Sequence, residues 1–536
     1  MIMPRKKETA APVNETAEQV KTEEKVVTKA EKPKKTTRSS SGTRKSASAA
    51  KSEPAKTTRK KKVPYVKVLF ASSEVAPFAA SGGLADVAGS LPVYLNRNDC
   101  DVRVILPLYS SISQQWREKM KFITFFYLSL SWRSAYCGVF ELEDRGVTYY
   151  FIDNEQYFSR PTLYGEYDDG ERFAFFSKAV IEALCRIDFE PDIIHCNDWQ
   201  TALVPVYLRD YRWVEKLANV KTLFTIHNIQ FQGQYDPYIL GDLFGLPESD
   251  LPLMSWNGCL NLMKAAIELS DKVNTVSPTY AGEIMDPWYS FGLDPLLRGL
   301  QFKLCGILNG IDFDVWNPET DPAIPEKYSA ADQSGKLACK HDILSEFGLS
   351  DDGRPLAVMI ARLTEQKGVD LLVPVMDQLI HNGVQIAILG TGDKKYEDIF
   401  TEMTYRYPGS CSAKIAYNTA LSKRMYAGAD MFLMPSKTEP CGLAQMQAMR
   451  YGTVPIVRKT GGLSDSVRDC GDGEGWGFTF QNYEPWDMFG AIMRAKDMYY
   501  NNWEDWYEVR TRAMECDMSW NKSAISYKFL YSEMKG

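Results

Sequence analysis

The sequence lacks the features that mark membrane and secreted proteins. No stretch approaches about 18 uninterrupted apolar residues, so no membrane-spanning helix is expected. No apolar segment of about 7 to 15 residues follows the opening Met-Ile-Met-Pro-Arg, which argues against a secretory signal. The eleven cysteines are scattered singly without a CxxC pair, and there are only four histidines. We therefore expect a cytoplasmic protein with neither a disulfide framework nor a zinc site.

Motifs for phosphoryl transfer are missing as well. The chain has no GxxxxGK[ST] loop and none of the protein-kinase signatures. In enzymes that transfer phosphoryl groups, these motifs hold the phosphates and the magnesium ion. Their absence disfavours that class of reaction.

Residues 1–62 lack aromatic residues, leucine and cysteine, and they hold 18 Lys/Arg against 7 Glu. Such a segment cannot bury enough apolar surface to fold, so we expect a disordered basic tail. A tether to a polyanion, a ribosome or a glucan particle is the alternative. Subtracting the tail's net charge of +11 from the chain's −7 leaves −18 for residues 63–536. This acidic body is not expected to bind nucleic acid.

The 536 residues, 45% of them hydrophobic, are enough for two sizeable cores. Helical stretches such as Arg172 to Arg186 and Thr201 to Lys216 alternate with apolar runs. Those runs predict buried strands at 65–72, 102–106, 147–152, 192–195, 222–226 and 272–276, and again at 355–360, 385–389, 431–434 and 454–457. The pattern predicts an α/β fold with two facing Rossmann-like domains and a ligand cleft between them.

Glycine-rich loops recur where these strands end. Ser81-Gly82-Gly83 follows the first strand, Gly390-Thr391-Gly392 follows a strand of the second domain, and Thr460-Gly461-Gly462 follows a later one. Glycine lets the backbone approach a phosphate, and the following helix N-terminus supplies N–H groups. Gly-Gly also makes tight strand-to-helix turns without any ligand. Three such loops together favour a nucleotide-sugar.

Charged residues lie in similar places. Arg362 and Lys367 come directly after an apolar strand, where they would stabilise a departing diphosphate or serve as ordinary surface cations. Glu439 lies where a strand meets the helix that starts near Leu443, so its carboxylate would face a sugar or cap the helix. His195 ends a strand close to acidic and aromatic residues, and it is a candidate sugar-binding group or a structural histidine.

As a set, these residues resemble the bacterial glycogen/starch synthases, which are retaining glycosyltransferases with the two-domain GT-B fold. The likeness runs from Val66 to about Tyr527. It rests on Ser73-Glu74, Gly82 to Val87, His195 to Trp199, His227 to Gly233, Asn274 to Tyr280, Asn309 to Asp312, Arg362 to Gly368, Glu439 to Leu443 and Thr460 to Leu463.

The resemblance implies an ADP-glucose donor, transfer to the non-reducing end of an α-1,4-glucan with retention of configuration, and no metal or other cofactor. It implies that Arg362 and Lys367 hold the diphosphate, while Glu439 and His195 approach the transferred glucose. The other positions that it assigns to substrate are Gly82, Gly83, Asp86, Asp168, Asn228, Gln232, Gly392, Cys441, Gly442, Leu443, Thr460, Gly461 and Gly462.

One position departs from the family pattern. Family members commonly carry Lys two residues before the first Gly-Gly pair, and here that residue is Ala80. A charged hydrogen bond is worth about 1.5 to 3 kcal/mol, so weaker donor binding is expected. The choice between ADP-glucose and UDP-glucose stays open.

We expect the tail at 1–62, an acceptor-side domain at 63–303, a nucleotide-sugar domain at 304–510, and a helix at 511–536 that crosses back to the first domain. Same-face attack is preferred to double displacement, because no second carboxylate partners Glu439. Two other functions remain open. One is a GT-B transferase of the sucrose or trehalose phosphate type, and the other is a catalytically weak glucan-binding protein.

Overall fold

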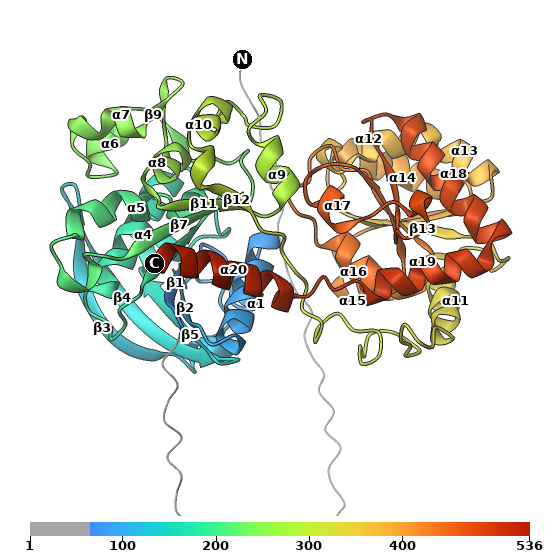
Figure 1. Cartoon of the computed structure of the whole chain (residues 1–536), viewed down its shortest axis with the longest axis horizontal. Coiled ribbons are helices and arrows are strands. Elements are labelled where there is room, and N and C mark those ends of the chain that lie inside the picture. Colours follow the sequence, from blue (N-terminus) through green and yellow to red (C-terminus); the bar gives the residue numbers. More distant parts are fainter. Residues whose placement is uncertain (1–64) are drawn as a thin grey trace, which may run out of the picture. The chain divides into compact units, whose positions relative to one another are not determined.

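The computed structural model describes residues 65–536, and the predicted tail at 1–62 lies outside the described residues. Two large sheets carry the fold (Figure 1), and we call the parts of the chain that build them the first and second halves. The first sheet has nine strands in the order β12-β11-β7-β6-β1-β2-β5-β4-β3. Their bounds are β1 (Lys67–Ala71), β2 (Asp101–Pro107), β3 (Lys121–Leu130), β4 (Arg133–Asp144), β5 (Val147–Asp153), β6 (Ile193–Asn197), β7 (Lys221–Ile226), β11 (Lys272–Thr275) and β12 (Leu304–Gly306).

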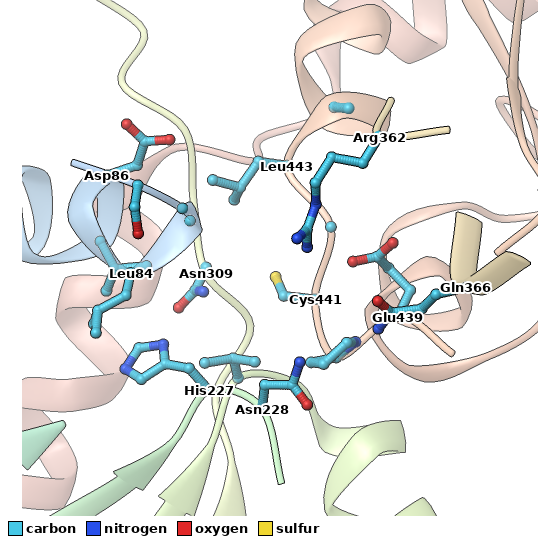
Figure 2. A pocket seen from close by; sticks show the side chains of 18 of the residues that line it. Leu84, Asp86, His227, Asn228, Asn309, Arg362, Gln366, Glu439, Cys441 and Leu443 are labelled. Atoms are coloured by element: carbon cyan, nitrogen blue, oxygen red, sulfur yellow. The ribbon is translucent and has the colours of Figure 1, made fainter. Parts of the chain in front are cut away.

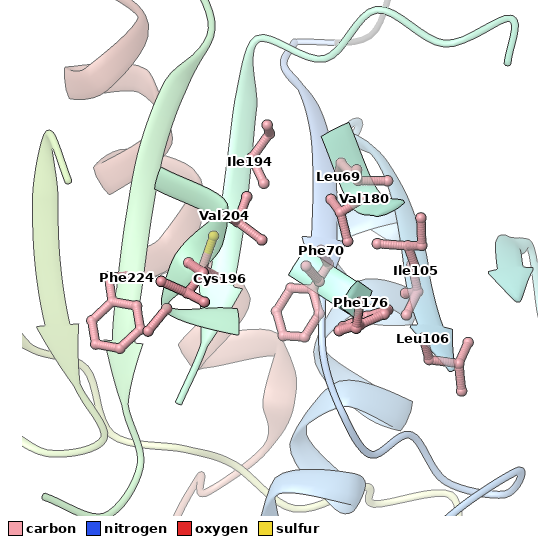
Figure 3. Close-up of a cluster of buried hydrophobic side chains, with 14 of the residues drawn as sticks. Leu69, Phe70, Ile105, Leu106, Phe176, Val180, Ile194, Cys196, Val204 and Phe224 are labelled. Atoms are coloured by element: carbon pink, nitrogen blue, oxygen red, sulfur yellow. The ribbon is translucent and has the colours of Figure 1, made fainter. Parts of the chain in front are cut away.

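The central strands of this sheet are parallel and buried on both faces. In the register, Phe70 of β1 lies opposite Val104 on one side and His195 on the other. Figure 3 shows Phe70 packed with Phe176 and Val180, which belong to helix α4 (Asp169–Leu184). This burial explains why these strands read as continuous apolar runs rather than as alternating patterns.

The second sheet has six strands, all parallel, in the order β15-β14-β13-β16-β17-β18. Their bounds are β13 (Leu356–Ile360), β14 (Gln385–Gly390), β15 (Cys411–Ile415), β16 (Met431–Met434), β17 (Val454–Arg458) and β18 (Phe478–Phe480). The sequence predicted these two α/β units with parallel strands. The exact domain boundaries stay predictions.

The remaining elements surround the two sheets. A small sheet holds β8 (Gln234–Tyr235), β9 (Ser255–Trp256) and β10 (Cys259–Asn261). The other α-helices are α1 (Gly83–Arg97), α2 (Gln114–Arg117), α3 (Glu155–Phe158), α5 (Leu203–Leu208), α6 (Ile239–Asp242), α7 (Leu251–Met254), α8 (Leu262–Leu269), α9 (Pro278–Glu283), α10 (Asp294–Gly299), α11 (Gly335–Phe347), α12 (Val369–Leu372), α13 (Met376–His381), α14 (Lys394–Arg406), α15 (Thr419–Gly428), α16 (Ala444–Arg450), α17 (Gly461–Ser466), α18 (Pro485–Asn501), α19 (Trp503–Glu515) and α20 (Trp520–Lys535). Within residues 65–536, none of the helices has the length and apolar character that crossing a bilayer requires.

The C-terminal helix α20 packs against first-half elements. It contacts α1, and Figure 1 shows it in red beside α1 and β1. Asn274 of β11 donates a hydrogen bond to the Tyr527 hydroxyl at 3.0 Å. Trp520, Tyr527 and Tyr531 are fully buried with the first-half core. The last helix of the chain therefore completes the first hydrophobic core.

Two segments differ from the sequence-based expectation. Residues 201–216 do not form one helix, because α5 ends at Leu208 and short 3-10 turns follow. The Arg212 guanidinium donates to the carbonyls of Leu217, Ala218 and Val220 at 3.1, 3.2 and 2.6 Å, and these bonds hold the chain in a turn. The antiparallel hairpin of β3 and β4 was not predicted.

Candidate active site

A cavity of about 710 Å³ is lined by residues from both halves. Figure 2 shows Leu84 and Asp86 on one side, with Arg362, Gln366 and Glu439 on the opposite side. The predicted site residues that line this cavity are Gly82, Gly83, Asp86, Asn228, Arg362, Lys367, Glu439, Cys441, Gly442 and Leu443. The structure therefore brings together most of the predicted site from segments far apart in the sequence.

The first glycine pair, Gly82-Gly83, starts α1 and is open to the cavity. Glu74 Oε2 accepts hydrogen bonds from the Ser81 and Gly82 N–H groups at 2.6 and 3.0 Å. The hydroxyl of Tyr164 donates to the other oxygen of Glu74 at 2.7 Å. Burial, together with the charge of Glu74, raises the pKa of Asp86. Because a carboxylate already occupies the Ser81 and Gly82 N–H groups, these two groups are not free to bind a phosphate.

The opposite side of the cavity carries its cations. Lys367 Nζ lies 2.6 Å from Glu439 Oε2, and the Ser436 hydroxyl donates to the same oxygen at 3.0 Å. Glu439 is only 7% exposed, so this pairing offsets the cost of burying its charge. Arg362 is exposed, and within residues 65–536 its guanidinium has neither an ion-pair partner nor a hydrogen bond. It is therefore free to bind an anion.

The pair Gly461-Gly462 is not among the residues that line the cavity, and the role of Thr460, Gly461 and Gly462 in a phosphate cradle stays a prediction. A Cβ at Gly461 would lie 2.0 Å from the Glu439 carbonyl oxygen, and one at Gly462 would lie 2.2 Å from that of Cys441. The Gly462 N–H also donates to the Glu439 carbonyl at 3.1 Å. These glycines are needed because another backbone segment packs directly against them. They support the loop that carries Glu439.

Glu283, at the end of α9 in the first half, holds this support in place. Its Oε1 accepts hydrogen bonds from the Thr460 hydroxyl and the Gly461 N–H, both at 2.9 Å. Burial raises the pKa of Glu283. A carboxylate of the first half thus fixes the backbone on which the Glu439 loop rests.

His195 was predicted to approach the glucose through its backbone or its imidazole, and this stays a prediction, because His195 is not among the residues that line the cavity. Its side chain is fully buried within β6, where Nδ1 bonds the Tyr531 hydroxyl at 2.8 Å and Nε2 bonds the Thr225 hydroxyl at 2.5 Å. Burial lowers its pKa well below the usual value. The strand continues to Asn197, so His195 lies inside the sheet rather than at its end.

His227 lines the cavity instead. It directly follows β7, and its Nε2 bonds Asn197 Oδ1 at 2.9 Å. Burial lowers its pKa to about 3, so the imidazole is neutral. The Asp198 carboxylate accepts a hydrogen bond from the His227 backbone N–H at 2.7 Å. Asp198 has a φ of +56°, and burial raises the pKa of its carboxyl group to about 7. The position of His227 after a strand end was the signal that could have identified it.

Three other predicted residues lie outside the cavity lining. Asp168 pairs with Arg160 at 2.5 Å just before α4, and its neighbour Asp169 lines the cavity in its place. A Cβ at Gly392 would lie 2.4 Å from the Leu363 carbonyl oxygen, so close backbone packing explains this glycine. Gln232 is buried and bonded to neighbouring loop carbonyls.

Sequence reasoning also missed residues that do line the cavity. Tyr164, Gln366 and Ser436 are among them. Asn309 is a further case, because its Oδ1 is buried without a hydrogen-bond partner among residues 65–536. A buried acceptor without a donor is costly, and a ligand hydroxyl would satisfy it. No local pattern distinguishes these residues, since their role depends on which segments meet in the fold.

Comparison with known proteins gives two family matches. Residues 67–299 match the family described as the starch synthase catalytic domain, and residues 341–498 match glycosyl transferases group 1. Together these matches confirm the predicted fold class, two α/β domains of the GT-B type.

Curated relatives match along nearly their whole length. The glycogen synthase of Geobacillus thermodenitrificans is 48% identical over 475 residues, which cover 88% of this chain and 98% of the relative. The glycogen synthase of Streptococcus uberis is 44% identical, covering 88% of this chain and all of the relative. These matches confirm the resemblance noted from the motifs.

Two solved structures show the same fold. The catalytic domain of starch synthase IV from Arabidopsis thaliana, bound to ADP and acarbose, has a TM-score of 0.81 and 36% identity, covering 88% of this chain and 99% of that one. The sucrose-phosphate synthase from Thermosynechococcus elongatus has a TM-score of 0.55 and 17% identity, covering 87% and 98%. The second likeness extends to the fold alone.

Proposed function

The chain belongs to the glycogen/starch synthase family of glycosyltransferases, and from that premise we propose that it transfers glucose from ADP-glucose to an α-1,4-glucan. The transfer adds glucose at the non-reducing end of the glucan and retains the α configuration. The observation that carries this proposal is that a free cation, Arg362, and a buried and partnered carboxylate, Glu439, line the same side of one cavity. The Arabidopsis relative binds ADP, which is what ADP-glucose becomes after losing its glucose.

In the proposed mechanism, Arg362 binds the diphosphate and stabilises its charge as the bond to glucose breaks. Lys367 is already paired with Glu439 at 2.6 Å, so it adds positive charge and orients the carboxylate. Glu439 stabilises the oxocarbenium-like centre. The acceptor hydroxyl attacks from the face that the diphosphate leaves, and its proton passes to an oxygen of the departing diphosphate. No second carboxylate has been identified as a partner for Glu439, so we prefer same-face attack to a covalent intermediate.

The first-half side of the cavity binds the glucose hydroxyls. Glu74, Asp86 and Tyr164 offer oxygen atoms there, and the unpartnered Asn309 Oδ1 accepts from a sugar hydroxyl. Because the imidazole of His227 is neutral, its ring adds no charge beside the anionic donor. The glucose is therefore expected between these first-half groups and Glu439, with the diphosphate at Arg362.

The test uses radiolabelled ADP-glucose with glycogen, followed by digestion with an α-1,4-specific amylase. Labelled oligosaccharides are expected from the parent chain and from Arg406→Ala, which changes a cation outside the cavity. The Arg362→Ala variant is expected to lose roughly 100-fold or more in kcat, as for the removal of one group that stabilises transition-state charge. Absence of labelled product from the parent would refute the proposed reaction. A parallel assay with UDP-glucose identifies the donor.

We also propose that the enzyme works in the cytoplasm. All eleven cysteines lie among the described residues, and each is a free thiol. Unpaired cysteines in this number are typical of a reducing compartment.

A further inference from the structure

Two short helices join the two halves of the molecule directly. α9 follows β11 of the first sheet, α17 follows β17 of the second sheet, and the two helices contact each other (Figure 1). The Asp465 carboxylate of α17 accepts hydrogen bonds from the Thr279 N–H and hydroxyl groups, at 2.9 and 2.7 Å. In return, Glu283 of α9 accepts hydrogen bonds from the Thr460 hydroxyl and the Gly461 N–H. We call these five residues the reciprocal clasp.

Each carboxylate of the clasp binds the N-terminal turn of the opposite helix. Thr279 lies in the first turn of α9 and Gly461 is the first residue of α17, so neither N–H group has a partner within its own helix. A carboxylate is favourable there, because a helix N-terminus carries a partial positive charge. Glu283 and Asp465 lie at the C-terminal ends of their own helices, so the two helices run antiparallel. The clasp therefore favours one register of α9 against α17.

On the first-half side, α9 supports the loop that follows β7. The Ile229 N–H donates a hydrogen bond to the Tyr280 hydroxyl at 3.2 Å, and the two residues before Ile229, which are His227 and Asn228, line the catalytic cavity. Val276 lines the cavity as well, and it lies two residues before α9 begins. Part of the first-half wall of the cavity thus rests on α9.

On the second-half side, α17 supports the loop that carries Glu439. The Gly462 N–H donates to the Glu439 carbonyl at 3.1 Å and to the Pro440 carbonyl at 3.2 Å. Glu439, Pro440 and Cys441 all line the cavity. One wall of the cavity therefore rests on α9 and the opposite wall rests on α17, and the clasp joins the two supports.

We propose that Asp465 and Glu283 are positioning residues, which fix the spacing between the two walls of the catalytic cavity. This inference rests on the proposed function, because the spacing matters for holding glucose between the first-half groups and Glu439. A site closed around its substrate keeps water out, which a transferase needs because water competes with the acceptor. The clasp holds the walls at the spacing that admits the glucan hydroxyl and excludes water.

Loosening the clasp has a defined chemical consequence. Water takes the place of the acceptor hydroxyl, and its oxygen forms a bond to the C1 carbon of the glucose as the bond from that carbon to the diphosphate oxygen breaks. The proton of the water passes to the released diphosphate. The products are then free glucose and ADP instead of a lengthened glucan and ADP.

The test follows labelled glucose from ADP-glucose into glycogen and into free glucose. In Asp465→Ala, we expect the ratio of hydrolysis to transfer to rise roughly tenfold, because water enters the loosened cavity. The kcat for transfer should fall roughly 10-fold to 100-fold, since a small displacement of Glu439 is enough for such a loss. Asp465→Asn offers Thr279 one acceptor oxygen and one N–H donor, so its ratio should stay within about threefold of the parent.

The matched control is Asp271→Ala. Asp271 accepts hydrogen bonds from the Thr222 N–H and hydroxyl groups, at 2.8 and 3.2 Å, so its removal deletes the same two kinds of contact within the first half. We expect it to lower stability in urea and to keep the parent ratio of hydrolysis to transfer. Thr279→Val removes only the hydroxyl contact and serves where Asp465→Ala does not fold, and its ratio should rise roughly threefold. An unchanged ratio in Asp465→Ala and Thr279→Val, or an equal rise in Asp271→Ala, overturns the proposal.

Backbone hydrogen exchange, followed by mass spectrometry, tests the clasp without any reaction. In Asp465→Ala, segments 227–231 and 439–443 should both exchange faster than in the parent, although the substitution lies in neither segment. In Asp271→Ala, both segments should keep the parent rate. Parent rates at both segments in Asp465→Ala would refute the clasp as their joint support. If the two segments respond as expected but the parent transfers no glucose, the proposed function fails and the clasp stands.

Discussion

The two Gly-Gly pairs look alike in the sequence but differ in the structure. Nothing lies within 4 Å of a Cβ placed at Gly82 or Gly83, and both glycines line the catalytic cavity. A Cβ placed at Gly461 would lie 2.0 Å from the Glu439 carbonyl oxygen, and one placed at Gly462 would lie 2.2 Å from the Cys441 carbonyl oxygen. The first pair leaves room for a ligand, whereas the second pair leaves room for the backbone of residues 439–441. A glycine motif thus reports a close approach, but it does not say what approaches.

The largest expected effect is at the packed pair. In Gly462→Ala, the added methyl meets the Cys441 backbone, which cannot move without displacing the Glu439 loop. We expect a loss of about 3 kcal/mol of folding free energy, together with a large fall in kcat. Gly82→Ala, where the methyl meets open space, is expected to stay within about 0.5 kcal/mol of the parent. Urea unfolding of both variants measures the difference, and equal stabilities would show that the pairs are equivalent.

Next in size is the carboxylate behind the packed pair. Glu283→Ala leaves the Thr460 hydroxyl and the Gly461 N–H without their acceptor, which costs about 2 kcal/mol. Because Glu439 shifts with its support, kcat should fall while the KM for a short acceptor stays near the parent value. Glu283→Gln keeps an acceptor oxygen and should restore much of the activity. If Ala and Gln behave alike, Glu283 does not position the loop.

A smaller expected effect is the pH dependence of folding stability that comes from His227, which lies beside the open glycine pair. Burial lowers the pKa of His227, beside the open pair, to about 3, whereas the unfolded chain has about 6.5. Below pH 6.5 the unfolded state therefore binds the proton, and folding stability falls as the pH drops towards 3. His227→Asn should reduce this slope by about 1.4 kcal/mol per pH unit. His341→Asn changes a half-exposed histidine and serves as the control, and equal slopes in the two variants would contradict the assignment.

The smallest expected effect concerns the open pair itself. Ala80 is exposed two residues before Gly82, so Ala80→Lys adds a flexible cation at the cavity without disturbing the core. We expect the KM for ADP-glucose to fall roughly threefold to tenfold, which is a modest gain because solvent screens the added charge. Steady-state kinetics with ADP-glucose and UDP-glucose measure it. An unchanged KM for both donors would mean that Glu74 and its neighbours leave no anion site there.

The sequence predicted the fold class and the residues at strand ends, because both depend on local sequence patterns. The parallel strands are buried on both faces, so they read as apolar runs, and residues that follow them, such as Arg362 and Glu439, gather at one cavity. The hairpin of β3 and β4 was missed because its outer face carries exposed aromatics such as Phe125 and Tyr127, which obscure the alternation. The fold class needed only these runs.

What could not be predicted depends on contacts between distant segments. The role of Gly461 follows from Glu283, which lies 178 residues earlier in the chain. His195 and His227 differ only in whether their strand has already ended, and strand ends are uncertain by a few residues in sequence-based prediction. Hence the sequence predicted which segments meet at the cavity, but it did not predict what each glycine and histidine in those segments contacts.

The packing of α20 has a consequence for how the protein is made. Trp520, Tyr527 and Tyr531 complete the core of the first half, although the ribosome adds them only after the whole second half. At about 5 to 20 residues per second, the first sheet emerges from the ribosome on the order of tens of seconds before its last helix. During that interval the surface that α20 will cover is open to chaperones and to other chains. Newborn molecules are therefore exposed to aggregation until α20 has left the ribosome and covered this surface.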